Sequence, residues 1–369
     1  MFFRLPVVRF FNRVINRATV TVALVLLQIG WLLWAFFSLT AGKVWVNAGL
    51  NVLSLFITLY LVRKDENSDY KIIWLVLIGL MPLLGGALYL AFGNKAPAKR
   101  MRQRMQAVER QHTADLAQQP GQTEALDPAS RGLCRYIADY GPYPAWKDTT
   151  AKYYPCGEEM YPDLLADLEG AERFIFLEFF IVRTGRMWGG AEDILVRKAR
   201  AGVEVRLLYD AIGSWKLSER FVRRLRGAGI EVRAYAPLRF PWFSPRANRR
   251  NHSKIAVIDG CVGFLGGMNI ADRYVRGTRW GTWRDTHFRI EGSGAAGLQA
   301  SFLSDWSATT KQQIAAAEYY PPAARFTDNI MQIVSSGPFG KWRTLLQADS
   351  YAIARARRRV WIQTPYYLP

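Results

Sequence analysis

Three long apolar runs near the start of the chain constrain its fold more than any other feature. They cover residues 20–39, 44–62 and 72–92, and each is close to the ~20 residues that a helix needs to cross a bilayer. One such run could be a buried helix of a soluble protein, but three in succession favour a membrane. A cleaved signal peptide is the alternative for the first run, yet the run is longer than a signal core and lacks a clear cleavage site. We therefore expect residues 1–92 to form a transmembrane region of two to three spans.

The charge balance predicts an anionic partner. Lys and Arg number 49 against 30 Asp and Glu, which gives a formal net charge of +19 for 369 residues. Nucleic acid and an anionic bilayer surface both suit such a charge. The apolar runs favour the membrane, so we expect no nucleic acid as partner. Basic residues flank every run, so the positive-inside rule does not decide which side of the membrane the rest of the chain occupies.

A connector over residues 93–131 is expected after the apolar runs. Residues 95–110 are basic and suit either an interfacial helix on anionic headgroups or a solvated linker helix. Residues 111–131 are rich in Gln, Ala, Pro and Gly, a composition typical of a flexible linker.

Strands alternate with helices from about residue 132 onward, which predicts an α/β domain. We expect strands at residues 173–182, 203–209 and 230–235, and helices at residues 191–200 and 217–226. Glu178 is a charge inside an apolar strand, and it either approaches a site as a hydrogen-bond partner or lies at a strand end. Gly213 and Ser214 follow the end of a strand, where open α/β sheets place ligand loops, so they are binding candidates.

His252 and Lys254 are the residues best suited to chemistry. They lie two apart in a strand-like run, so their side chains are expected on one face. A histidine that attacks phosphorus and a lysine that neutralises phosphoryl oxygens form a phosphodiester site that requires no metal and no cofactor. Asp259 is five residues after Lys254, on the other face or in a turn, so within this catalytic set we interpret it as structural support. The alternative is an ordinary buried hairpin with a satisfied histidine.

Small and polar residues after the hairpin complete the expected site. Asp259 and Gly260 predict a tight turn, and the returning strand leads into Gly266 and Gly267. Glycines let backbone amides approach an anion closely, and Asn269 adds a side-chain donor.

Cysteine and histidine are scarce, with three of each in the chain. The cysteines have neither metal-ligand spacing nor an even count, so no metal site and no disulfide framework is predicted.

Two segments beside the motif are further candidates. Residues 236–251 interleave aromatic residues with arginines, a pattern that suits base stacking, a lipid headgroup boundary or an ordinary surface loop. The apolar runs upstream favour the headgroup boundary. In residues 279–287, either Asp285 or His287 is expected near the motif, although a cluster at a strand edge is equally consistent.

The run H-S-K-I-A-V-I-D followed by G-G-M-N resembles the H-x-K-x4-D motif of the phospholipase D superfamily, and its surroundings resemble bacterial cardiolipin synthases. The second and third apolar runs are similar to the two-helix membrane region of those enzymes. The resemblance implies a phospholipase D-like α/β sandwich domain in a bacterial inner-membrane protein. It also implies phosphatidyl transfer, in which His252 attacks one phosphatidylglycerol, glycerol leaves, and a second lipid resolves the phosphatidyl-histidine. A phospholipid hydrolase is one alternative, and a membrane-attached nuclease or nucleic-acid-binding protein is another.

The end of the chain echoes its middle. Residues 326–369 repeat strand, helix and strand, and Gln363 falls where Glu178 fell. In the resembling family each half brings one H-x-K motif, and the chain stops at Pro369 before a second. We therefore expect a first half over residues 132–325, the start of a truncated second half over residues 326–369, and no activity from this chain alone. A single-motif protein that pairs two copies in a dimer is the alternative.

Overall fold

The computed structural model describes residues 41–64, 68–93, 121–141, 143–237, 250–279, 281, 283–312, 314, 316–320, 329–336 and 344–363, with isolated positions between residues 23 and 116. Contacts divide the chain into two units. One comprises residues 1–96 with 238–249, and the other comprises residues 97–237 with 250–369.

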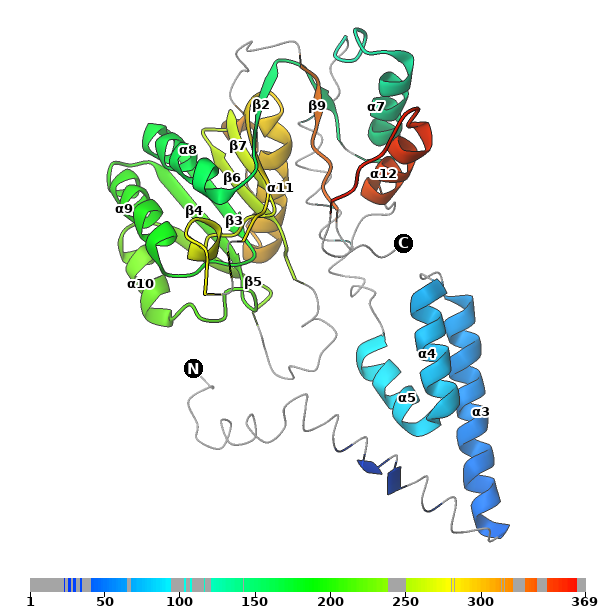
Figure 1. Cartoon of the computed structure of the whole chain (residues 1–369). Helices are drawn as coiled ribbons and strands as arrows, with labels where there is room; N and C mark the ends of the chain where they lie inside the picture. Colours follow the sequence, from blue (N-terminus) through cyan, green and yellow to red (C-terminus); the bar gives the residue numbers. More distant parts are fainter. Residues whose placement is uncertain are drawn as a thin grey trace. The chain divides into compact units, whose positions relative to one another are not determined.

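Helices make up the described part of the first unit (Figure 1). They are α3 (Ala41–Arg63), α4 (Ser68–Leu80), α5 (Pro82–Leu88) and a short π-helix, η2 (Tyr89–Gly93). Leu61, Ile78 and Tyr89 are buried between them, and the Tyr70 hydroxyl donates to Gly93 O at 3.0 Å. Pro82 lacks a backbone N–H, so the third apolar run is divided between α4, α5 and η2.

The apolar runs differ in how they fold. The second run forms most of α3, whereas most of the first run lies outside the described residues. Large apolar side chains are exposed along α3 and α4, among them Trp45, Leu53, Phe56, Ile73 and Leu80. Within the described ranges, the structure contains no helix whose length and apolar character together suffice to cross a membrane.

A seven-stranded mixed sheet organises the second unit, in the order β2-β8-β7-β6-β3-β4-β5. Its strands β3, β4 and β5 are parallel, and the remaining neighbours are antiparallel. The strands are β2 (Thr149–Tyr154), β3 (Phe174–Phe179), β4 (Glu204–Asp210), β5 (Glu231–Tyr235), β6 (Lys254–Ile258), β7 (Val262–Gly266) and β8 (His287–Gly292). The helices are α7 (Pro128–Tyr140), α8 (Gly157–Gly170), α9 (Arg186–Arg200), α10 (Glu219–Gly227), α11 (Ala295–Thr310) and α12 (Thr344–Arg355), with short 3-10 turns η4 (Asp272–Tyr274) and η5 (Ala316–Tyr319).

Helices cover both faces of this sheet, so β3 is buried on both sides (Figure 1). Ile175 and Leu177 pack in the layer that contains α8, α9 and α10. Phe174 and Phe176 alternate with them and pack against α11 on the other face. The predicted α/β domain is therefore confirmed, and the strands and helices expected between residues 173 and 235 all form.

Helix α9 begins one turn earlier than its sequence pattern predicts. The expected start was residue 191, but the structure starts the helix at Arg186. The Asp272 carboxylate, from η4, accepts hydrogen bonds from Arg186 N and Met187 N at 3.1 and 2.9 Å. A cap supplied by a residue 86 positions away satisfies the first amides of the helix, and no local pattern could have predicted it.

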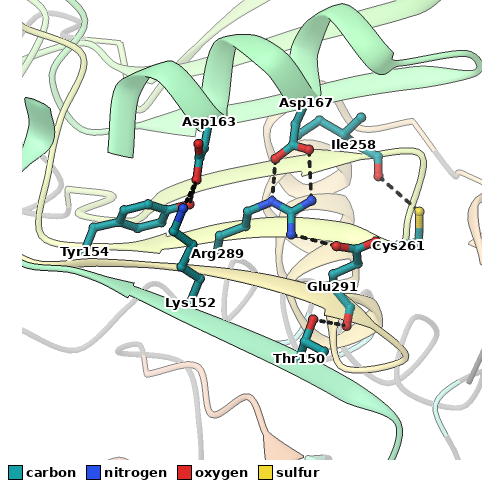
Figure 2. A network of polar contacts seen from close by, with 9 residues as sticks. All are labelled: Thr150, Lys152, Tyr154, Asp163, Asp167, Ile258, Cys261, Arg289 and Glu291. Atoms are coloured by element: carbon teal, nitrogen blue, oxygen red, sulfur yellow. Dashed lines mark hydrogen bonds and ion pairs between the residues drawn. The ribbon is translucent and has the colours of Figure 1, made fainter. Parts of the chain in front are cut away.

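A polar network joins α8 to the β2 edge of the sheet (Figure 2). Arg289 on β8 donates two hydrogen bonds to Asp167 at 2.6 and 2.9 Å. Asp163, one turn earlier on α8, accepts from Lys152 at 2.5 Å and from the Tyr154 hydroxyl at 2.6 Å. These contacts hold the outer strands in place and leave the centre of the sheet to carry the motif.

The C-terminal part of the chain agrees with prediction in part, because a short strand and a helix form in the expected order. The short strand β9 (Met331–Gln332) pairs with β1 (Ala145–Trp146) in a separate two-stranded sheet, and α12 contacts α7. The strand predicted near the end of the chain does not form over residues 360–363, where Trp361 is 82% exposed. A strand requires a neighbour for its backbone groups, and none pairs with this segment among the described residues. The start of a second half therefore remains a prediction.

Candidate active site

The motif lies on the central hairpin of the sheet, formed by β6 and β7. Lys254 pairs with Phe179 of β3, at the end of β3 where parallel strands place ligand loops. The hairpin turn is confirmed, because Asp259 and Gly260 both have positive φ values of 52° and 76°. The prediction that His252 belongs to the same strand is wrong, since β6 begins at Lys254. His252 belongs to the short segment that leads into the strand.

His252 and Lys254 nevertheless converge on one aromatic ring. The His252 and Phe180 rings are 4.8 Å apart between centroids, and Lys254 Nζ is 5.8 Å from the centroid of Phe180. Lys254 Nζ also donates to the carbonyl of His252. His252 is exposed, whereas Lys254 is 6% exposed. The arrangement presents an accessible imidazole beside a sheltered ammonium.

The charges of this pair are tuned by burial. Burial lowers the pKa of His252, the Lys254 charge lowers it further, and Asp210 partly opposes them. Burial lowers the pKa of Lys254 from 10.5 to about 8, with Asp285 opposing the shift. The imidazole is therefore neutral, and nucleophilic, at pH values where the lysine still carries its charge.

Asn269 has most of its hydrogen-bonding capacity committed within the fold. Its Oδ1 accepts from Ile181 N at 2.8 Å, and its Nδ2 donates to the Tyr274 hydroxyl at 3.1 Å. The side chain is 3% exposed. Its amide fixes the segment that follows β3, next to Phe180, and within the described residues the second N–H of Nδ2 makes no hydrogen bond. A contact of that N–H with a phosphoryl oxygen stays a prediction.

The two glycines at the end of β7, Gly266 in the strand and Gly267 just after it, make room for other residues. A side chain at Gly266 would collide with Thr286 O and His287 Nδ1 at 2.4 and 2.5 Å, and one at Gly267 would collide with Asp285 Oδ1 at 2.0 Å. The Gly267 amide donates to Thr286 O at 2.9 Å. It is therefore not available to bind an anion, although the sequence predicted that role for it. The glycines admit the strand that follows, and that strand brings its own polar groups to the motif.

Asp285 favours the charged form of Lys254, and the Lys254 charge in turn acts on His287. His287 is 1% exposed, and burial with the Lys254 charge lowers its pKa to about 4. Its Nδ1 has no hydrogen-bond partner within the part of the chain that the structure describes. His287 is therefore neutral and enclosed, and Asp285 is the acid that favours the charged form of Lys254.

Asp259 lies at the opposite end of β6 from His252 and Lys254. Its Oδ1 accepts from Arg173 N and Phe174 N, and its Oδ2 accepts from Glu172 N, each at 2.8 Å. The two ends of β6, Lys254 and Ile258, are about 13 Å apart along the strand, and Asp259 lies one residue beyond Ile258. Asp259 thus holds the start of β3, which agrees with the structural interpretation of this residue.

Ser214 and Gly213 support the same loop after β3. The Ser214 hydroxyl donates to Phe180 O at 3.1 Å and accepts from Val182 N at 2.9 Å. A side chain at Gly213 would lie 2.2 Å from Phe180 O. Both residues brace the backbone that carries Phe180, rather than presenting groups to a ligand.

Glu178 lies on the other face of the sheet from Lys254. It is 1% exposed, and its Oε1 accepts from Asn251 Nδ2 at 2.6 Å. The same Nδ2 donates to Asp305 Oδ2 on α11 at 2.8 Å. Sequence reasoning missed Asn251 and Asp305, although an acid in the apolar stretch of α11 was a signal.

The aromatic and basic stretch over residues 238–249 lies outside the described residues.

Metal ligands do not gather anywhere in the described ranges, where no group of three or more His, Cys, Asp or Glu could hold an ion. The cysteines are free.

Comparisons with known proteins agree with this geometry. The family described as "Cardiolipin synthase, PLD-like domain" matches residues 164–306, and "Phospholipase D-nuclease N-terminal" matches residues 49–94. A cardiolipin synthase of Geobacillus kaustophilus is 35% identical over 366 residues, which is 96% of this chain and 72% of that protein. Cardiolipin synthase 2 of Bacillus cereus is 35% identical over 312 residues, 83% of this chain and 61% of that protein.

Solved structures are more distant. NucT from Helicobacter pylori is 12% identical with a TM-score of 0.35, over 44% of this chain and 97% of that one. That likeness adds nothing to the assignment. The sequence relatives and the matched PLD-like domain, which contains the His252 and Lys254 pair, are sufficient: the chain belongs to the cardiolipin synthase family of phospholipase D-like proteins.

Proposed function

We propose that this protein is a phosphatidyltransferase that makes cardiolipin from two molecules of phosphatidylglycerol. The observation that carries the proposal is an exposed histidine beside a buried lysine of lowered pKa, within a chain of this family. A neutral imidazole and a charged ammonium coexist between the pKa values of the two groups, and phosphoryl transfer requires both.

In the first step, a nitrogen of His252 attacks the phosphorus of one phosphatidylglycerol. The phosphorus–nitrogen bond forms, the bond from phosphorus to the glycerol oxygen breaks, and glycerol leaves with a proton. In the second step, a hydroxyl of another phosphatidylglycerol loses its proton and attacks the phosphatidyl-histidine, which releases His252 and gives cardiolipin. The family resemblance implies that a second histidine transfers these protons.

Lys254 stabilises the charge that develops on the phosphoryl oxygens. Its ammonium is sheltered from water, and its attraction for an anion is stronger there than in a solvated site. Asn269 supports the loop beside the pair, and one of its N–H groups is a candidate second donor. Asp259 acts only through the fold.

A membrane location follows from the substrate and from the first unit. The exposed apolar side chains of α3 and α4 suit contact with lipid acyl chains. We infer a bacterial inner-membrane protein with phospholipid as its partner and no nucleic acid.

The test is an assay of the full-length gene product, purified in detergent, with phosphatidylglycerol as sole substrate. We expect glycerol and cardiolipin to appear in equal amounts, and His252→Ala to abolish both. Phosphatidic acid in place of cardiolipin would identify a hydrolase. Cleavage of single-stranded DNA without glycerol release would overturn the proposal in favour of a nuclease.

A further inference from the structure

Three polar side chains, those of Glu178, Asn251 and Asp305, meet between the sheet and α11. Glu178 shares this face of β3 with Phe174 and Phe176, which pack against α11. Asn251 Nδ2 donates both of its hydrogens, one to Glu178 Oε1 at 2.6 Å and one to Asp305 Oδ2 at 2.8 Å. One amide therefore bridges two acids from two different elements, and neither acid is used in the proposed reaction.

The remaining polar groups of Asn251 fix the backbone on both sides of His252. Asn251 Oδ1 accepts from Ser253 N at 2.8 Å, and Asn251 N donates to Asp210 Oδ2 at 3.1 Å. Ser253 O in turn accepts from Phe180 N at 3.1 Å. Residues 251–253 are not part of β6, so these contacts, rather than the hydrogen bonds between paired strands, orient the segment.

We propose that Glu178 and Asp305 are positioning residues for the reaction, which hold Asn251 and thereby fix the direction in which the His252 imidazole faces the phosphorus. The catalytic consequence rests on the proposed function, whereas the effect on His252 itself does not. The acids act through Asn251 and touch no substrate, because they lie on the face of the sheet opposite Lys254.

Protonation makes the two acids compatible. Burial raises the pKa of Glu178 well above 4.5, and the Asp305 charge and a hydrogen bond to Asp305 raise it further. Burial also raises the pKa of Asp305. Two adjacent carboxylates do not both ionise at low cost, so the pair retains one proton, and Glu178, whose pKa is raised by the neighbouring acid as well as by burial, carries it. The oxygens that face Asn251 then both remain acceptors.

Other titratable groups surround the pair. Asp210, at the end of β4, is 3.5 Å from Arg250 Nη1, and this ion pair offsets its charge. Tyr235, on β5, has a raised pKa because of burial and the three nearby acids, so it stays neutral. The single proton between Glu178 and Asp305 is thus the one that sets the geometry of the bridge.

Amide substitutions test this arrangement sharply. In Glu178→Gln or Asp305→Asn, an amide N–H replaces the shared proton, the net charge is unchanged, and Asn251 keeps two acceptors. The double variant brings two amide groups face to face with more donors than acceptors. Glu178→Leu removes the acceptor altogether. Asp193→Asn, at an exposed position on α9, is the matched control.

Two readouts are measured on the full-length gene product in detergent. The first is cardiolipin synthesis, with kcat and KM determined separately. The second is the pH dependence of diethyl pyrocarbonate modification at His252, followed by mass spectrometry, which requires no turnover. We expect both single amide variants and the control to keep kcat within about threefold. The double variant and Glu178→Leu should lose about tenfold or more in kcat at nearly unchanged KM, and far more than the product of the single effects.

The modification midpoint separates positioning from general damage. In Glu178→Leu and in the double variant it should move up toward 6.5, because a released imidazole loses the burial that lowers its pKa. Asn251→Ala should do the same, and it serves where another variant fails to fold. Unchanged midpoint and kcat in these variants, or additive effects in the double variant, would overturn the inference. A wild-type protein with the expected midpoint but no cardiolipin would instead refute the proposed function.

Discussion

The polar residues at the two ends of strand β6 differ in how far the fold satisfies their hydrogen bonds and charges. At one end, Asp259 has both carboxylate oxygens bound by three backbone amides. At the other end, His252 is exposed and Lys254 is buried with an electrostatically unfavourable charge. A side chain whose bonding capacity is exhausted inside the protein stabilises the fold, and one with capacity to spare is available for chemistry. The same motif therefore contains both kinds of residue.

The largest effect should come from His252→Ala. Without the nucleophile no phosphatidyl-histidine forms, so we expect cardiolipin synthesis to fall to background in a micellar assay while the thermal midpoint stays that of the wild type. Asp193→Ala is the control and should retain full activity. Normal turnover by the histidine variant would show that the exposed end of β6 is not the reactive end.

Lys254→Met should sharpen the contrast between stability and activity. We expect kcat to fall by about 10²- to 10³-fold, the scale for losing one charged donor at a transition state. The pKa of Lys254 in the fold lies below its ordinary 10.5, so burying its charge costs free energy below about pH 8, and that cost disappears as the pH rises from about 8 to 10.5. The variant should therefore melt no lower than the wild type at neutral pH. Lys311→Met, at an exposed position after α11, is the control. A lower melting point with normal kcat in Lys254→Met would reverse the assignment.

Asp259→Ala should show the reverse pattern. Three amides at the start of β3 lose their acceptor, so we expect the free energy of unfolding to fall by about 1–3 kcal/mol. Activity per folded molecule should change little, because the residue is remote from the catalytic pair. Urea unfolding and kcat at a temperature well below the transition measure the two quantities. A stable but inactive variant would place Asp259 in the chemistry.

The pH profile should reveal the two groups at the reactive end. Activity should persist somewhat below pH 6.5, because the pKa of His252 is lowered, and then fall as the imidazole is protonated. It should fall again as the pH rises through about 8, where Lys254 loses its charge. In Lys254→Arg the upper limb should vanish over the accessible range, since arginine stays charged. An unchanged upper limb would assign it to another group.

The smallest effect is expected from a chelator. A site that uses an imidazole nucleophile and an ammonium needs no divalent ion, so activity in excess EDTA should match the untreated enzyme. Loss of activity on chelation, with recovery on adding a divalent ion, would contradict the proposed mechanism.

Much of the second unit could be predicted from local pattern. Apolar runs bounded by glycines marked β3, β4 and β5, and Asp259 with Gly260 marked the hairpin turn. The start of α9 and the hydrogen bond of the Gly267 amide could not be predicted. Asp272 caps α9 and Thr286 accepts from Gly267, and both partners are distant in sequence. The strand expected near residue 360 is absent over residues 360–363, the described part of that segment, for a related reason: a strand needs a neighbour to pair with.

The sequence by itself determined the family and the fold class, and it predicted His252 and Lys254 as the candidates for chemistry, because motif spacing and alternating apolar runs are local properties of a chain. Only the tertiary structure decided how those residues are held. It showed that His252 precedes its strand, that Asn269 and Ser214 brace the loop of Phe180, and that Asn251 joins Glu178 to Asp305. Each of these contacts joins residues more than thirty positions apart. Hydrogen bonds over such separations depend on how the sheet and its helices pack, and no local pattern encodes them.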